Sequence, residues 1–209
     1  MKKKILVFSP HTDDGELGCG GTIVKYLEKK NPIYYTVFSM AEKSVPKGFP
    51  KDILAKELKR AMDVLGVSSN KITKFNYDVR EFPKFRQEIL EDMVKIGDLI
   101  RPDVVLTPSS KDIHQDHRVI YEETLRAFKK TTILGYEEPW NNITFDTRAI
   151  NPLEKRHIKK KIDALMCYKT QKKRAYLNEE YIWGLARTRG TQIEKDYAEA
   201  FEVIRWVLD

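Results

Sequence analysis

Short apolar runs and longer amphipathic stretches alternate along the first 130 residues of the chain. The apolar runs have the length of buried strands, whereas the longer stretches repeat their apolar residues at helical spacing. The predicted strands are 4–8, 33–40, 71–77 and 103–107. The predicted helices are, to within a few residues, 16–29, 52–65, 85–100 and 116–130. Four strand–helix units in succession predict a parallel sheet that carries helices on both faces.

The pattern changes after residue 131. Two further strands are expected at 132–137 and 143–150, followed by helical segments and a last apolar run at 201–208. No stretch has the composition of a linker, and no internal repeat is present. We therefore expect one α/β domain over residues 1–209, in which strand and helix elaborations follow the parallel sheet.

The composition is typical of a globular protein, with 41% hydrophobic and 33% charged residues. No apolar run approaches the roughly 18 residues that a membrane span requires. The two cysteines, Cys19 and Cys167, lie far apart and lack metal-type spacing, as expected for free thiols in a reducing compartment. We therefore expect a cytoplasmic protein with no membrane-inserted segment.

Much of the net charge of +7 comes from one segment. Residues 155–174 contain nine Lys or Arg and a single acid, Asp163. An apolar stripe at helical spacing also runs through this segment, at Ile158, Ile162, Leu165 and Met166. We interpret the basic residues as the solvated face of a helix, with attraction of an anionic substrate as a secondary interpretation. No aromatic–basic RNA-binding motif occurs, so we expect no nucleic-acid partner.

Three of the four histidines lie in two polar clusters that follow predicted strands. "PHTDD", with His11, follows the first strand, and "SSKDIHQDH", with His114 and His117, follows the fourth. In parallel sheets, ligands bind beyond the carboxyl ends of the strands, so the two clusters are expected to share one site. The fourth histidine, His157, falls in the basic helix and is interpreted as a surface residue.

Metal binding explains both clusters together. His11 and Asp14 straddle a tight turn with Asp13 beside them, while His114 and His117 are three residues apart at the start of a helix. Three ligands of the N, O, N type with one open position are typical of catalytic zinc, although another divalent transition ion fits such a site. Such an ion activates water, an unligated carboxylate can act as general base, and a further imidazole can donate to an oxyanion.

Two simpler interpretations compete with a metal site. Asp13, Asp14 and Asp116 can each cap a helix, but this does not explain why two His/Asp clusters occur at one end of a sheet. The glycines at 18, 20 and 21 are similar to a dinucleotide-binding loop, yet the full G-x-G-x-x-G pattern is absent and the upstream acids would repel a pyrophosphate. We interpret these glycines as positions where the first helix packs closely against the sheet.

The stretches "PHTDDGELGCGGTI" and "PDVVLTPSSKDIHQDHRVI" together resemble the LmbE-like, or PIG-L-type, N-acetylglucosaminyl deacetylases. "CYKTQ" and "LARTRGTQIEKDYAEAFEVIR" are similar to the C-terminal region of that family, so the resemblance covers most of the chain. It implies a single LmbE-like deacetylase domain, 1–209, with a Rossmann-like sheet and a zinc-dependent activity on N-acetylglucosamine-containing molecules. Thr12 stands where the family usually has proline, and Gly15 where it often has an acid or alanine; neither change removes a reacting group.

The resemblance also implies a role for each residue of the two clusters. The zinc ligands would be His11, Asp14 and His117. Asp13 would be the general base that deprotonates water, and His114 would stabilise the tetrahedral oxyanion. Asp116 would hydrogen-bond and orient a neighbouring imidazole. This assignment separates the two aspartates of "PHTDD", which spacing alone does not.

Three residues are candidates for substrate contacts. Arg80 and Arg86 follow the third predicted strand, at the same sheet end as the clusters, where a guanidinium can bind a hydroxyl, phosphate or carboxylate. Salt bridges with Asp78 and Glu81 are the alternative for both. Trp140 can form a wall for a sugar ring. The expected partner is a small N-acetylated sugar or sugar conjugate, and a homo-oligomer is left open.

Two other functions fit parts of the pattern. A metal-dependent phosphohydrolase would draw anionic substrates to the basic surface, but it would normally need a second metal and more carboxylates than the clusters supply. A non-catalytic nucleic-acid-binding module would use the positive charge, which is modest. A hydrolase that removes an N-acetyl group through metal-activated water explains both clusters, so we prefer it.

Overall fold

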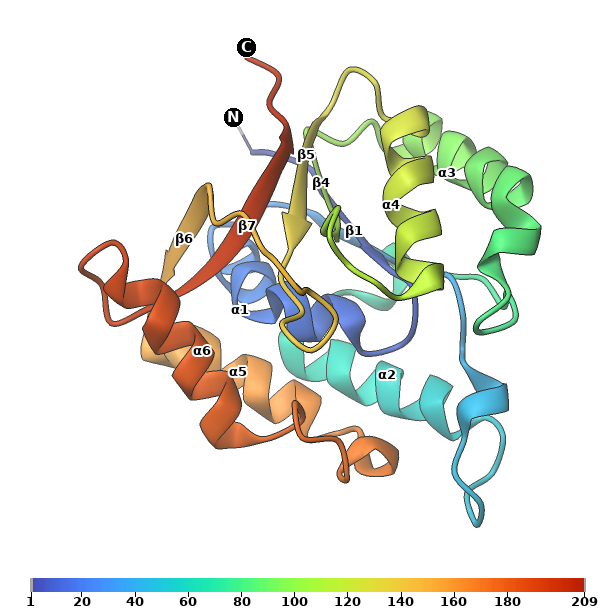
Figure 1. Ribbon diagram of the computed structural model, residues 1–209, viewed down its shortest axis with the longest axis horizontal. Helices are drawn as coiled ribbons and strands as arrows, with labels where there is room; N and C mark the ends of the chain where they lie inside the picture. Colours follow the sequence, from blue (N-terminus) through green and yellow to red (C-terminus); the bar gives the residue numbers. More distant parts are fainter. Residues whose placement is uncertain (1, 209) are drawn as a thin grey trace.

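The computed structural model describes residues 2–208 as a seven-stranded sheet with helices on both faces (Figure 1). The strands are β1 (Ile5–Ser9), β2 (Ile33–Val37), β3 (Ile72–Lys74), β4 (Val104–Pro108), β5 (Thr132–Tyr136), β6 (Ala149–Leu153) and β7 (Tyr197–Arg205). The helices are α1 (Asp14–Glu28), α2 (Ile53–Leu65), α3 (Arg86–Ile100), α4 (Gln115–Ala127), α5 (Lys155–Leu165) and α6 (Glu179–Thr191). Short 3-10 turns are η1 (Glu42–Ser44), η2 (Ser69–Lys71), η3 (Phe82–Phe85) and η4 (Lys169–Gln171).

The strand order is β3-β2-β1-β4-β5-β7-β6. The first five strands of this order are parallel, β7 runs antiparallel to β5, and β6 runs antiparallel to β7. This confirms the predicted α/β fold and its C-terminal elaborations. The chain winds outward in one direction from β1 and in the other from β4, so the switch point at which open α/β sheets bind ligands lies between these two strands.

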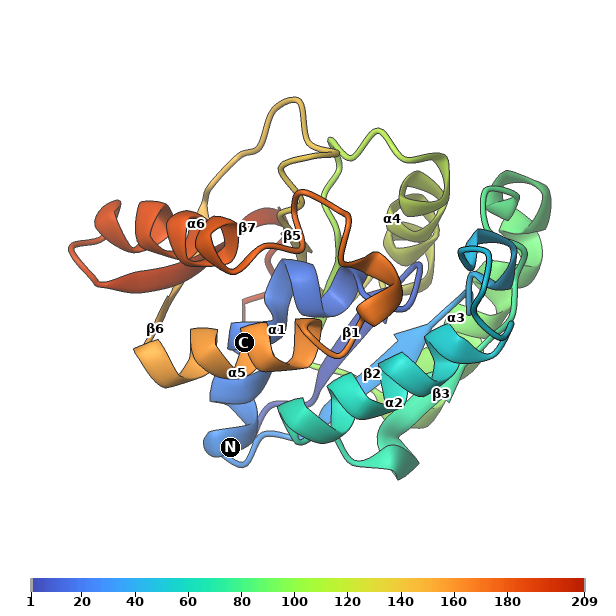
Figure 2. The same ribbon diagram turned by 90° about the horizontal axis from the view of Figure 1, so that it is seen from below.

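Two hydrophobic clusters fill the space between the sheet and its helices. The larger cluster lies under α1, α2, α5 and α6, and the smaller one lies under α3 and α4 on the opposite face (Figures 1 and 2). Strands covered on both faces explain why β1 and β4 are apolar at nearly every position. Among residues 2–208, no helix combines the length and the apolar character needed to cross a bilayer.

The strand predicted at 143–150 was only partly right, because β6 begins at Ala149. Before it, the backbone N–H groups of Asn141 and Asn142 both donate to the carbonyl of Glu138, at 2.8 and 2.9 Å. After this tight turn the chain stays outside the sheet until β6 begins at Ala149. The last apolar run, 201–208, was given no secondary structure from the sequence; its first five residues belong to β7, which begins earlier, at Tyr197.

Helix α1 is interrupted at Cys19, whose φ of −144° is not helical. Beyond the interruption, the N–H groups of Gly21 and Thr22 donate to the Glu199 carboxylate of β7, at 3.0 and 2.7 Å. Glu199 in turn pairs with buried Lys161 of α5 at 2.7 Å. The second half of α1 is therefore capped by a side chain from the far end of the sequence. The first half, which begins at the "DD" pair, is separated from the second by the non-helical backbone at Cys19.

Two predictions for the basic helix were wrong. His157 is only 2% exposed, because its Nδ1 accepts from the backbone N–H of Glu154 and its Nε2 donates to Glu28 at 3.0 Å. This contact forms a capping box at the start of α5. Lys161 was expected on the solvated face, but it is buried because Glu199 lies opposite it. The remaining lysines of α5 fit the predicted solvated face.

Candidate metal centre

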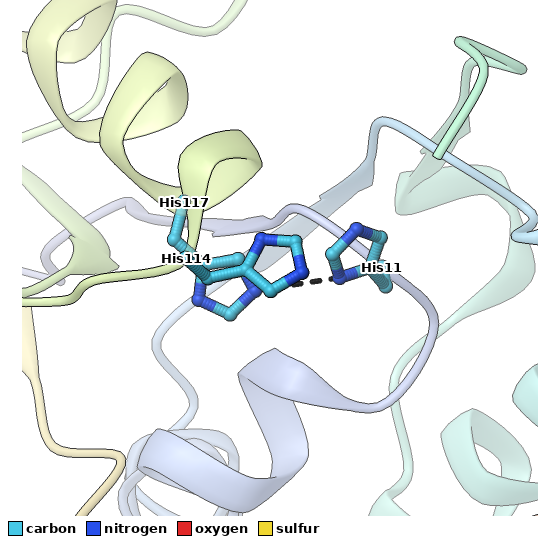
Figure 3. Close-up of side chains that lie close together, drawn as sticks. All are labelled: His11, His114 and His117. Atoms are coloured by element: carbon cyan, nitrogen blue, oxygen red, sulfur yellow. Dashed lines mark hydrogen bonds between the residues drawn. The ribbon is translucent and has the colours of Figure 1, made fainter. Parts of the chain in front are cut away.

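The two predicted polar clusters meet at the carboxyl ends of β1 and β4, which are neighbours in the sheet. His11 lies in the loop after β1, and Asp14 is the first residue of α1. His117 lies in the first turn of α4, and His114 immediately precedes that helix. Figure 3 shows the three imidazoles facing one another across the gap between these loops. The structure thus brings together residues that are about a hundred positions apart in the sequence.

Three side-chain atoms form a nearly equilateral triangle at the centre of this cluster. The Nδ1 of His11 lies 3.1 Å from Oδ2 of Asp14 and 3.3 Å from Nε2 of His117. The third side, from Nε2 of His117 to Oδ2 of Asp14, is 3.2 Å. Ligand atoms that surround a tetrahedral zinc at about 2.0–2.1 Å lie about 3.3 Å from one another. The donor set and its spacing therefore fit a zinc-like ion.

Each histidine of the triangle has its second ring nitrogen held by a carboxylate. Nε2 of His11 lies 3.0 Å from Oδ2 of Asp116, and Nδ1 of His117 lies 2.8 Å from Oδ2 of Asp112. Each carboxylate accepts a hydrogen bond from the N–H of its imidazole, so in the neutral form of each ring the lone pair lies on Nδ1 of His11 and on Nε2 of His117. Those are the two nitrogens of the triangle.

The electrostatics of the cluster also favour a cation. Burial lowers the pKa of His11, but Asp14 and Asp116 outweigh it and raise that pKa to about 9. Burial raises the pKa of Asp14, yet His117 and His11 hold it well below its usual range. The acids therefore draw positive charge onto the imidazoles as protons. A divalent cation supplies the same charge to the same atoms.

Asp13 lies beside the triangle and is 8% exposed. It occupies the N-cap position of α1, but its side chain makes no capping hydrogen bond. Burial and the neighbouring charge of Asp14 raise the pKa of Asp13 to about 7. Its carboxylate lines the pocket above the cluster and is available to exchange a proton near neutral pH.

His114 caps α4, because its Nδ1 accepts from the backbone N–H of Asp116 at 3.2 Å. Asp116 was considered as the cap of this helix, but its carboxylate instead contacts His11 and the N–H groups of Arg80 and Phe82, at 2.5 and 3.2 Å for the latter two. Burial and the nearby His117 lower the pKa of His114 to about 4. His114 is therefore neutral, with its proton on Nε2. Its ring lies 4.6 Å from that of His117 between centroids.

Two buried acids of the cluster were missed by the sequence reasoning. Asp112 fixes His117, as described above, and its Oδ1 also accepts from the backbone N–H of His114 at 2.8 Å. Glu138 lies 3.5 Å from Nδ1 of His117, and burial raises the pKa of Glu138 well above its usual range. Both follow strands that end at the site, and Glu138 is the second residue after β5, in "GYEEPW". That position was the available signal.

A pocket opens above the cluster, and it contains two of the three candidate substrate residues. Arg80 and Trp140 line it, together with Asp13 and residues of the segment after η4. Trp140 stacks on Tyr176 with ring centroids 4.1 Å apart. Arg86 is not brought to the pocket, because α3 directs it toward α4. There it pairs with Glu122 and Glu123, rather than with the acids considered from the sequence.

Residues 6–128 match the family described as GlcNAc-PI de-N-acetylase, PIG-L. The chain belongs to this family. The matched residues make up more than half of the 209 residues of this chain, and they include His11, Asp14 and His117. A curated relative, the uncharacterized deacetylase YaiS of Escherichia coli K12, is 28% identical over 81% of this chain and 92% of its own length.

Solved structures show how widely this fold occurs. N,N'-diacetylchitobiose deacetylase from Pyrococcus horikoshii superposes with a TM-score of 0.82 at 23% identity, over 97% of this chain and 84% of its own. GalB, the 4-carboxy-2-hydroxymuconate hydratase of Pseudomonas putida KT2440, superposes with a TM-score of 0.81 at 18% identity, over 100% and 98%. The fold therefore carries both a deacetylase and a hydratase, so the reaction has to be argued from the site.

Proposed function

We propose that this PIG-L chain is a metal-dependent hydrolase that removes the acetyl group from an N-acetylglucosamine-type sugar or its conjugate. The observation that supports this proposal most directly is the triangle of His11, Asp14 and His117, with the unligated carboxylate of Asp13 beside it. Membership of a de-N-acetylase family supports the choice of bond. We also propose that residues 1–209 act as a single deacetylase domain, because β6 and β7 extend the same sheet as β1.

The triangle would hold the ion through Nδ1 of His11, Oδ2 of Asp14 and Nε2 of His117. Two imidazoles and one carboxylate suit zinc, although other divalent transition ions bind such donors. When bound, zinc would activate a water molecule and polarise the amide carbonyl. Asp116 and Asp112 would keep the two imidazoles in the required tautomer and orientation.

Asp13 would take a proton from the attacking water and return it to the leaving nitrogen of the sugar. A group that serves both steps works best with a pKa near the operating pH, and burial beside Asp14 raises the pKa of Asp13 to about 7. His114 would donate its Nε2 hydrogen to the developing oxyanion of the amide. Its low pKa does not prevent this, because the neutral ring still carries one N–H.

Two variants test these roles. Asp13→Asn should retain the metal and lose deacetylation by about 10²–10⁴-fold, since it removes the base and leaves the triangle intact. His117→Ala should lose both metal and activity. Asp146→Asn, which changes an exposed aspartate paired with Arg148, serves as the control. Acetate release and metal content are measured on each protein, and an Asp13→Asn variant with unchanged turnover would show that the proposed mechanism is wrong.

A further inference from the structure

Two arginines from distant parts of the sequence line the same pocket. Arg80 lies in the loop between β3 and α3, and Arg174 lies in the segment between η4 and α6. Both share the pocket wall with His11 and Asp13. Arg174 is also close enough to Asp13 to oppose the rise in the pKa of that carboxyl. Two arginines therefore line the pocket in which the substrate of the proposed reaction would bind.

Neither arginine has a carboxylate partner among residues 2–208. The Arg80 side chain makes no hydrogen bond there, although two acids flank it in the sequence. Those acids are engaged elsewhere: Asp78 pairs with Lys43 at 2.8 Å, and Glu81 pairs with Lys84 at 2.5 Å. Arg174 has one long contact, 3.4 Å from its Nε to Oε1 of Gln171.

Other arginines of the molecule differ in this respect. Arg86, Arg156 and Arg189 each meet at least one carboxylate within 3.0 Å. A guanidinium left without an anion beside a pocket is a ready partner for an anionic group of a ligand, because it can offer two parallel N–H donors. Arg80 and Arg174 are therefore free to bind an anionic ligand, whereas most other arginines of the described residues are already paired with a carboxylate.

Both arginines lie on segments that are anchored to the metal-binding loop. The backbone N–H of Arg80 donates to Asp116, which also contacts His11, and Arg80 adopts a left-handed φ of 69°. A non-glycine residue in this region is held there by its surroundings. On the other side, the Tyr168 hydroxyl at the start of the η4 segment donates to the carbonyl of Thr12 at 2.5 Å. Figure 2 shows this segment passing over the beginning of α1.

Asp13 and Asp14 are the acids of the wall, and the proposed function assigns both to the reaction centre. The remaining polar residues of the wall are the histidines of the metal centre and neutral side chains such as Asn141 and Gln171. We propose, on the basis of the proposed function, that Arg80 and Arg174 bind an anionic group of the substrate, so that the pocket selects an N-acetylated sugar bearing a phosphate or a carboxylate.

The test compares binding and turnover on neutral and anionic sugars. Calorimetry on the zinc-loaded protein measures the affinity for glucosamine and for glucosamine 1-phosphate, and acetate release gives kcat/KM for N-acetylglucosamine, its 1-phosphate and N-acetylmuramic acid. We expect the anionic sugar to be preferred about 10–100-fold in both measurements, as for a charge-assisted hydrogen-bond pair. Preference for the phosphate or for the carboxylate identifies which anion the pocket takes.

Arg80→Gln and Arg174→Gln should each reduce the anionic-to-neutral ratio at least tenfold, and the lysine variants should restore part of it. Lys173→Gln removes the same charge from the neighbouring position, which does not line the pocket, and should keep the ratio. Equal affinity of the wild type for neutral and anionic sugars, or a ratio unaffected by both glutamine variants, would overturn the inference. Binding without acetate release from any sugar would contradict the proposed function alone.

Discussion

Asp112→Ala removes a residue to which the sequence analysis gave no role and that the structure places behind a proposed metal ligand. Its Oδ2 holds Nδ1 of His117 at 2.8 Å, and its Oδ1 accepts from the backbone N–H of His114 at 2.8 Å. With alanine, the imidazole of His117 can rotate and can carry its proton on the nitrogen that faces the metal. We expect weaker metal binding in a protein that still folds.

The size of the effect follows from the contacts that are lost. Glu138 lies 3.5 Å from the same Nδ1, which is too long to replace the missing hydrogen bond. Loss of a carboxylate that orients a ligating histidine typically reduces metal affinity about 10–100-fold. At about 1.4 kcal/mol per factor of ten, this is about 1.4–2.8 kcal/mol, in the range of a single hydrogen bond to a charged group.

The assay is competition for zinc between the protein and a chromogenic chelator, with folding checked by thermal unfolding of the metal-free protein. Asp146→Ala, a change of the same type on the exposed surface, is the matched control. We expect the dissociation constant for zinc to rise 10–100-fold for Asp112→Ala and to stay unchanged for the control. A folded Asp112→Ala protein with wild-type zinc affinity would refute the role given to this carboxylate, and with it the assignment of Nε2 of His117 as the ligand atom.

Three further predictions concern the contacts that hold α1 in place. Glu199→Gln leaves Lys161 buried without its charge partner and should lower the free energy of unfolding by about 3–5 kcal/mol in urea titrations. Gly18→Ala places a methyl group against the Tyr136 ring and should cost about 1–3 kcal/mol, whereas Gly184→Ala, in open space on α6, should be neutral or stabilising in the same titration. Hydrogen bonds from Arg156 and His157 lower the pKa of Glu28 to about 2. The stability that Glu28 contributes is therefore fully present above the unfolded pKa of 4.5 and is lost as pH falls through 2. The difference in Tm between wild type and Glu28→Gln should shrink over that pH window.

The sequence predicted the place of the site better than its inner contacts. Strand–helix alternation sets the direction of the parallel strands, and this alone sends the residues after β1 and β4 to one edge of the sheet. His11, Asp14 and His117 meet there because β1 and β4 are neighbours. Asp112 was inside the quoted motif but had no ligand spacing to mark it. Its role depends on which ring nitrogen it faces, and that is decided by side-chain rotation in the folded protein.

Contacts between distant segments account for the errors elsewhere. The apolar stripe of α5 correctly placed Ile158 in the core, but periodicity treats every lysine of such a helix as solvated. Lys161 is buried because Glu199 lies opposite it, and Glu199 is there because it also caps the second half of α1. A pairing of this kind depends on the placement of β7 next to β5, which local sequence patterns do not determine.

The pocket combines two parts of the chain with different contributions. All the residues of the proposed metal site and the proposed base and oxyanion donor lie within 6–128, the part that matches the PIG-L family. Trp140, Gln171, Arg174 and Tyr176 of the pocket wall lie beyond it. The first part would therefore supply the proposed chemistry and most of the pocket wall, while the second adds aromatic and polar side chains that a sugar conjugate would meet. Arg80 belongs to the first part and is tied to the metal centre, because Asp116 holds the backbone of Arg80 and the imidazole of His11 with the same carboxylate oxygen. A substrate anion bound by Arg80 would thus be positioned relative to the reaction centre through a single side chain.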